Sequence, residues 1–168
     1  MKWTYYVLTV LFLSGINVMP ALAKEQKLAH VDLSRVFDNY QKTKDFDAVL
    51  QGQGEAFTKE RESMIAKIRD GQGKLALLKE EEKKKLNDSI EKQKEELLEY
   101  DKQKRTELAK QRDEKVREIL LEIEKVVSDI AKKEGYDYIL NDRVLIYGDP
   151  NNNLTEKVLK ALNDSFKK

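Results

Sequence analysis

The sequence YDYILNDRVLIYGDPNNNLT, residues 136–155, contains two short apolar runs separated by Asn141-Asp142-Arg143. Runs of this length around a polar turn predict two β-strands, YDYIL and VLIY, in a hairpin. A strand with one face in water alternates apolar and polar residues, whereas here both parities are apolar. One parity holds Tyr138, Leu140, Val144 and Ile146, and the other holds Ile139, Leu145 and Tyr147. We therefore expect a hairpin that is covered on both faces.

The residues around this hairpin predict where the neighbouring helices end and begin. Gly135 suits a left-handed C-cap at the end of a helix, and Lys132 and Lys133 suit its last turn. Asp149-Pro150 ends the second strand, and Thr155 is expected to cap a final helix. Towards the other end of the chain, KLAHVDLSRV at 27–36 predicts one strand, followed by a short helical turn capped by Asp32 or Ser34.

Residues 41–134 are expected to form a long helix, because they contain no proline and are dense in Lys, Glu, Gln, Leu and Arg. Their apolar residues recur every eleven positions, which is three helical turns at about 3.67 residues each. The recurring positions are Leu86, Leu97, Leu108, Ile119 and Ile130, with the earlier sets Phe46, Phe57, Ile68 and Met64, Leu75. This spacing predicts a narrow apolar stripe along a straight or slightly right-handed coil.

The stripe needs a partner, so we expect the helix to fold back on itself as a hairpin. The candidate turns are 79–84 and 87–89. Between residues 101 and 115 the stripe thins to little more than Leu108 and Ala109. The two arms should therefore be thinly packed near their middle, leaving apolar side chains available for binding.

Two GQG pairs, at 52–54 and 71–73, interrupt the predicted helix. A phosphate-binding loop is excluded, because no strand precedes either pair and neither GxGxxG nor GxxxxGK[ST] is present. Each glycine costs about 0.5–1 kcal/mol relative to alanine inside a helix. The pairs are interpreted as flexible joints in the first arm.

Residues 1–23 have the pattern of a secretory signal peptide, with one positive charge, an uncharged apolar run and a terminal Ala21-Leu22-Ala23. The alternative is a transmembrane anchor, but Asn17 and Pro20 interrupt a run that is short for a span of about 20 apolar residues. We predict cleavage after Ala23 and export of the remaining chain. With no cysteine in the chain, no disulfide can stabilise the exported fold.

The charge balance narrows the possible partners. Cleavage would remove Lys2 from a chain of 32 basic and 31 acidic residues and leave the remainder formally neutral. A nucleic-acid binder usually has a strongly basic face, so no nucleic-acid partner is expected. Neutrality also argues against long-range attraction to lipopolysaccharide or a membrane surface.

A small hairpin and one further strand cannot bury a sufficient core alone, since isolated two-stranded hairpins are marginal in water. A projecting helical arm cannot cover them. Several copies that join their strands into one shared core would solve the problem. The expected oligomerisation core consists of Val31, Leu33, Tyr138, Ile139, Leu140, Val144, Leu145 and Ile146.

Taken together, KLAHVDLSRVF, the charged helical hairpin and GYDYILNDRVLIYGDPNNNLTEKVLKAL resemble the Skp/OmpH family of periplasmic chaperones. The resemblance implies an α+β fold in which a long helical hairpin projects from a small β-domain, and a homotrimer whose strands form a β-barrel. It divides the chain into a signal peptide (1–23), an oligomerisation domain (24–40 and 135–168) and an arm (41–134) with its tip near 79–84.

The same resemblance implies a holdase that works without ATP and encloses unfolded outer-membrane proteins between its arms. Contacts with such clients are hypothesised for Phe46, Phe57, Met64, Leu97, Tyr100 and Leu108, although ordinary helix packing would also explain each of them. No catalytic, cofactor or metal site is predicted, and His30 is interpreted as a strand-packing or rim residue. The alternatives are a structural coiled-coil spacer or adaptor of the envelope and an extracytoplasmic binder of polyanions.

Overall fold

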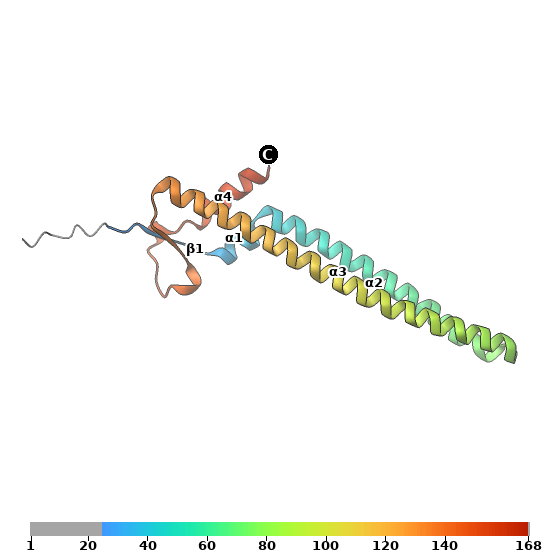
Figure 1. The fold of residues 1–168 in the computed structure, drawn as a ribbon. Helices are drawn as coiled ribbons and strands as arrows, with labels where there is room; N and C mark the ends of the chain where they lie inside the picture. Colours follow the sequence, from blue (N-terminus) through green and yellow to red (C-terminus); the bar gives the residue numbers. More distant parts are fainter. Residues whose placement is uncertain (1–24, 168) are drawn as a thin grey trace, which may run out of the picture.

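The computed structural model describes residues 25–167, which form a small head and one long arm (Figure 1). The arm consists of helices α2 (Gln41–Lys74) and α3 (Glu80–Glu134), joined through the short 3-10 helix η1 (Leu75–Leu77). The head contains the remaining elements and the C-terminal end of α3. These elements are β1 (Leu28–Val31), α1 (Leu33–Asn39), β2 (Tyr138–Asn141), η2 (Asp142–Val144), η3 (Pro150–Asn152) and α4 (Thr155–Phe166).

Helices α2 and α3 run antiparallel along the arm, as the sequence predicts for a folded-back hairpin. The connection occupies 75–79, just before the predicted tip, and of residues 79–84 only Lys79 lies outside a helix. The alternative turn at 87–89 lies inside α3. Glu82 accepts a hydrogen bond from the backbone N–H of Lys79 at 3.4 Å. Three glutamates in the first turn suit the positive end of the helix dipole.

The eleven-residue spacing marks the face along which the two helices meet. Every member of the set that begins at Leu86 is half-buried or buried, and so are Phe46, Phe57 and Ile68. Near the tip, Gly71 is buried against α3, and a Cβ atom there would lie 3.2 Å from Cγ1 of Ile90. This glycine permits close approach of the helices, a role that the sequence analysis did not anticipate.

The sheet has two parallel strands instead of the predicted hairpin. Leu28 pairs with Tyr138 and Val31 with Asn141, so the first strand of the chain lies beside β2. The second predicted strand is wrong for the single chain: residues 142–144 form η2, and 145–149 have no regular structure. A strand requires hydrogen bonds from a neighbour. Within the described residues of this one chain, no segment pairs with 144–147.

The head is held together by a compact apolar core. Its buried side chains come from β1, α1, α3 and α4 and from the positions flanking them: Ala29, Val31, Val36, Tyr40, Ile119, Ile123, Leu154, Val158 and Leu162. Helix α3 therefore contributes its C-terminal third to the head and the rest to the arm. None of the helices within residues 25–167 is long and apolar enough to cross a membrane.

Helix ends in the head follow the predicted chemistry with one exception. Gly135 has φ of 71° and ends α3 in the left-handed conformation, and Asp32 accepts a hydrogen bond from the backbone of Arg35 at the start of α1. The Thr155 hydroxyl does not cap α4, because it accepts the backbone N–H of Asp32 at 2.9 Å. The side chain of Asn153 accepts the N–H of Thr155 instead.

Candidate functional site

The middle of the arm differs from its two ends in how deeply its side chains are buried. In the described part of the arm, the buried residues are Thr43, Ile119 and Ile123 near the head and Ile68, Gly71 and Ile90 near the tip. Between these two zones, no side chain of α2 or α3 among the described residues is fully buried. The apolar stripe in this stretch is therefore left partly open to solvent.

The six predicted client-contact residues all lie half-buried on this stripe. Phe57, Tyr100 and Leu108 line one hollow of about 390 Å³ between α2 and α3. Met64 and Tyr100 line the next, of about 430 Å³. The rings of Phe57 and Tyr100 lie 5.7 Å apart, with an angle of 39° between their planes. Phe46 and Leu97 face the stripe but do not line these hollows.

Charged side chains border the aromatic pair. Asp101 joins the two helices through Arg61, with its Oδ1 at 2.8 Å from the Arg61 Nε, and accepts Arg105 of its own helix at 3.3 Å. The Arg105 guanidinium also lies 6.0 Å from the centre of the Phe57 ring. An unfolded segment that entered this region would meet aromatic surface with a carboxylate and two arginines beside it.

A second polar cluster holds the base of the arm. The Lys42 ammonium binds the carboxylates of Glu118 and Glu122, and the Tyr40 hydroxyl donates to Glu122 at 3.1 Å. Hydrogen bonds from Lys115 and Lys42 lower the pKa of Glu118 to about 2. Burial, together with the bond to Glu122, raises the pKa of Tyr40 to about 12. The base is thus fixed by both apolar packing and paired charges. These partners lie some 80 residues apart in the sequence, and no spacing rule connects them.

The head exposes apolar side chains that are unusual on the surface of a single chain. We call Tyr138, Leu140, Val144, Ile146 and Tyr147 the apolar strip; their exposed fractions range from 38% for Leu140 to 108% for Ile146. The predicted oligomerisation core therefore splits into two groups. Val31, Leu33 and Ile139 belong to the chain's own core, and Leu145 is half-buried, while the strip faces outward.

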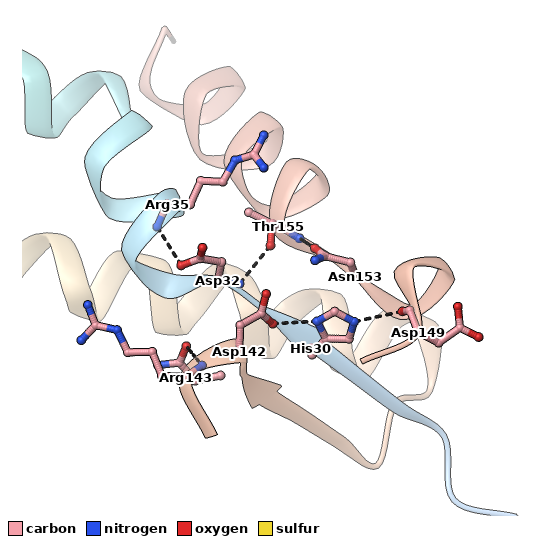
Figure 2. A network of polar contacts seen from close by, with 9 residues as sticks. His30, Asp32, Arg35, Asp142, Arg143, Asp149, Asn153 and Thr155 are labelled. Carbon is pink, nitrogen blue, oxygen red and sulfur yellow. Dashed lines mark hydrogen bonds and ion pairs between the residues drawn. The ribbon is translucent and has the colours of Figure 1, made fainter. Parts of the chain in front are cut away.

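His30 is buried in β1, at 8% exposure, between two aspartates (Figure 2). Its Nδ1 lies 2.6 Å from a carboxylate oxygen of Asp142, and its Nε2 lies 3.0 Å from the backbone carbonyl oxygen of Asp149. Of the two positions that the sequence analysis left open, strand-packing and rim, the structure shows a buried ring packed in the strand, which also connects β1 to the segment that follows β2. Sequence spacing alone does not reveal this contact, because its partners are more than 110 residues away.

Comparison with known proteins identifies the fold's relatives. The family model described as outer membrane protein (OmpH-like) matches residues 27–162, which include the whole arm and nearly all of the head. The chain belongs to this OmpH-like, or Skp/OmpH, family. Its members are non-enzymatic chaperones, and the chain is not an enzyme.

Individual OmpH-like relatives match over most of their length. The chain is 28% identical to the chaperone protein Skp of Vibrio cholerae over 92% of its own residues and 94% of that protein. The chaperone protein Skp of Blochmanniella pennsylvanica is 27% identical, over 87% of this chain and 89% of that one. A crystal structure from Caulobacter crescentus, described as an outer membrane chaperone (OmpH-like), has a TM-score of 0.78 at 11% identity and covers 86% of this chain and 88% of its own. That structure supports the fold alone.

Proposed function

We propose that this OmpH-like chaperone is a periplasmic holdase that binds unfolded outer-membrane proteins without ATP, in a cavity between the arms of a homotrimer. The observation that carries the proposal is the half-open stripe in the middle of the arm. Six apolar or aromatic side chains there are spread over both helices and are neither fully buried nor fully exposed. Many weak, separated contacts suit a client that has no fixed shape.

The aromatic surface of the arm is accompanied by charges that keep it hydrated. Arg61, Asp101 and Arg105 lie beside Phe57 and Tyr100 and limit the apolar area available at any one place. A client held by such small patches loses little free energy when it detaches from one of them. The arrangement therefore favours holding over permanent adhesion.

Assembly is the second part of the proposal. The apolar strip and the unpaired segment 144–147 would be covered if neighbouring chains joined their strands into a shared β-barrel. The domain division follows: 24–40 and 135–168 assemble, while 41–134 forms the arm. Trimers of this kind place three arms around a common space.

Location and partners complete the proposal. The signal peptide assigned to residues 1–23 lies outside the described residues, and it is the basis for placing the protein in the periplasm. The clients are unfolded outer-membrane β-barrel proteins, with no nucleic acid and no cofactor. The near-equal numbers of basic and acidic residues argue against lipopolysaccharide or a membrane surface as a main partner.

Native mass spectrometry tests the proposal directly. The processed protein, residues 24–168, is mixed with a urea-unfolded outer-membrane β-barrel protein during dilution of the urea. We expect a soluble trimer that carries one client. A trimer that stays empty while the client precipitates would contradict the holdase and favour the structural spacer. A monomer at all concentrations would contradict the assembly.

A further inference from the structure

The only histidine of the chain joins β1 to both ends of one segment in the head. Residues 142–149 leave the sheet at Asp142 and return towards η3 at Asp149. The His30 ring lies between these two ends, with one nitrogen on each of them (Figure 2). The backbone carbonyl of His30 also accepts the N–H of Leu154 at 2.8 Å, which fixes the chain just beyond the segment.

Both ring contacts are satisfied together only when the imidazole carries two protons. A carboxylate oxygen faces Nδ1 and a carbonyl oxygen faces Nε2, and both of these oxygens can only accept. A neutral imidazole has a single N–H, so one of its nitrogens would face an oxygen lone pair. The bonds to Asp149 and Asp142 raise the pKa of His30, and they outweigh its burial, which acts in the opposite direction.

The segment fits closely around the ring. A Cβ atom at Gly148 would lie 2.8 Å from the His30 Nε2, so a residue with a side chain would displace the imidazole. The Asp142 carboxylate is the titratable group that faces the ring, the Asp149 carboxylate lies nearby but points away from it, and Tyr147 lines the same small pocket (Figure 2). Its other lining residues, which carry no titratable group, are Leu145, Ile146, Gly148, Pro150 and Asn153.

The same segment carries three of the five residues of the apolar strip. Val144, Ile146 and Tyr147 are 72%, 108% and 81% exposed. Apart from η2, this part of the segment has no regular structure within the chain, so its shape depends on how its ends are held. Both ends are held by His30. A change in the protonation of this ring would therefore act on the surface that we assign to subunit contact.

We propose that His30 is a proton-dependent clamp that fixes segment 142–149 in the shape required for contact with a second copy of this chain. The inference rests on the proposed assembly and adds its regulation. The doubly protonated ring holds both ends, and the subunits associate most tightly in this state. When the ring loses a proton, one end is released and association weakens.

The structure also indicates which end is released. The N–H that faces the Asp142 carboxylate makes a charge-assisted hydrogen bond, which is stronger than a bond to a neutral carbonyl. The neutral ring should therefore keep its proton on Nδ1 and lose the one on Nε2. The Nε2 lone pair then faces the carbonyl oxygen of Asp149, and the Gly148–Asp149 end detaches first.

The sign of the pH dependence follows from the direction of the shift. Because the pKa of His30 is raised in the folded chain, the clamp is fully formed below the ordinary pKa of histidine. It is lost as the pH rises through the raised value. Acidic conditions should therefore favour the associated state and mildly alkaline conditions should weaken it.

Nuclear magnetic resonance of the imidazole tests the clamp itself. A single histidine gives one set of ring signals, so its pKa and tautomer can be read directly on the processed protein. We expect a pKa above the ordinary value of about 6.5 and an Nδ1–H tautomer in the neutral form. Asp142→Asn should lower the pKa towards that ordinary value. An ordinary pKa in the unmodified protein, or no decrease in Asp142→Asn, would overturn the clamp.

Asp149→Asn is the matched control. The same change of charge is made at the other end of the segment, but the Asp149 side chain accepts from Asn151 and touches the ring only through its backbone carbonyl. Its effect on the pKa of His30 should be smaller than that of Asp142→Asn. An equal effect of the two variants would show that general charge, and not the clamp, sets the pKa, and would overturn the proposal.

Sedimentation of the processed protein from about pH 5 to about pH 9 tests the link to assembly. The association constant should fall through the pKa of His30, by up to about tenfold per pH unit for each histidine released. His30→Gln should flatten this profile. Equal profiles for His30→Gln and the unmodified protein would overturn the link. Client precipitation in the presence of a fully assembled protein at acidic pH would contradict the holdase while leaving the clamp in place.

Discussion

The head and the middle of the arm use apolar residues in opposite ways. In the head, nine side chains from segments distant in sequence are buried together. In the middle of the arm, the described helices meet along a stripe where each apolar residue keeps some exposure. In the head, several elements contribute neighbours, and near the tip Gly71 lets the two helices approach closely enough to bury Ile90. The middle of the arm has neither arrangement, so its apolar side chains are not enclosed. The comparison teaches that the arm is closely packed at its two ends, where it borders the head and near the tip, and available for contact in its middle.

The largest loss of stability should come from creating a cavity in the densely packed head. Ile119 is fully buried, and Ile119→Ala should lower the free energy of unfolding by about 2–5 kcal/mol. Urea unfolding followed by circular dichroism at fixed protein concentration measures the loss. Leu98→Ala is the control, because Leu98 is 70% exposed on the same helix. Similar losses in the two variants would contradict the difference between head and arm.

The buried zone near the tip can be tested through a pair of glycines. Gly71→Leu should lower the free energy of unfolding by about 1–3 kcal/mol, because its side chain would be forced against Ile90. Gly73→Leu adds a side chain to open space and should stabilise the helix by a few tenths of a kcal/mol or more. Thermal unfolding of both variants provides the measurement. If Gly71→Leu were as stable as Gly73→Leu, the helices would not approach closely at this point.

Substitutions in the half-open stripe should weaken client binding. Phe57→Ser combined with Tyr100→Ser removes the aromatic pair and should weaken client affinity by about tenfold, the equivalent of about 1.4 kcal/mol. Light scattering during dilution of an unfolded outer-membrane protein, at several chaperone concentrations, measures the change. Leu98→Ser provides a control on the outward face of α3. Unchanged suppression of aggregation in the double variant, with the oligomer intact, would exclude these two rings from client contact.

The smallest effect is expected for the ion pair across the middle of the arm. Asp101→Asn removes the negative charge from the ion pair with Arg61, and because both side chains are partly exposed, the loss should be about 0.2–1 kcal/mol. The difference from the unmodified protein should shrink at high salt concentration. A loss as large as that of Ile119→Ala would mean that charge, and not apolar burial, holds the middle of the arm together.

The features that were predicted correctly depend on local sequence. The eleven-residue spacing identified the contact face of the arm because a helix fixes the direction of each side chain. Gly135, and Asp32 as one of two candidate caps, were recognised because caps have short-range signatures. The thin packing near Leu108 follows from the same count of apolar residues.

The features that the sequence analysis did not predict depend on contacts between residues of different segments of the chain. VLIY has the composition of a strand, but composition does not supply the neighbour that a strand needs, and in the single chain these residues pair with nothing that the structure describes. Thr155 has the chemistry of a cap, yet its hydroxyl binds Asp32, more than 120 residues earlier. The contacts of His30 are equally distant, and neither they nor the contact of Gly71 with Ile90 across the tip carries a local signature.

The parallel pairing of β1 with β2 has a consequence for the order of folding. Lys27 and Asp137, which hydrogen-bond beside the paired strands, are 110 residues apart. Closing so long a loop in one step has a large entropic cost. The arm divides this closure into shorter steps. Gly71 and Ile90 meet early, because only a short connection separates them, and pairing of the two helices from there towards the head brings Tyr40 towards Glu122. Zippering from the tip to the base then leaves only short ends to join, so the pairing of β1 with β2 should form late and should form quickly.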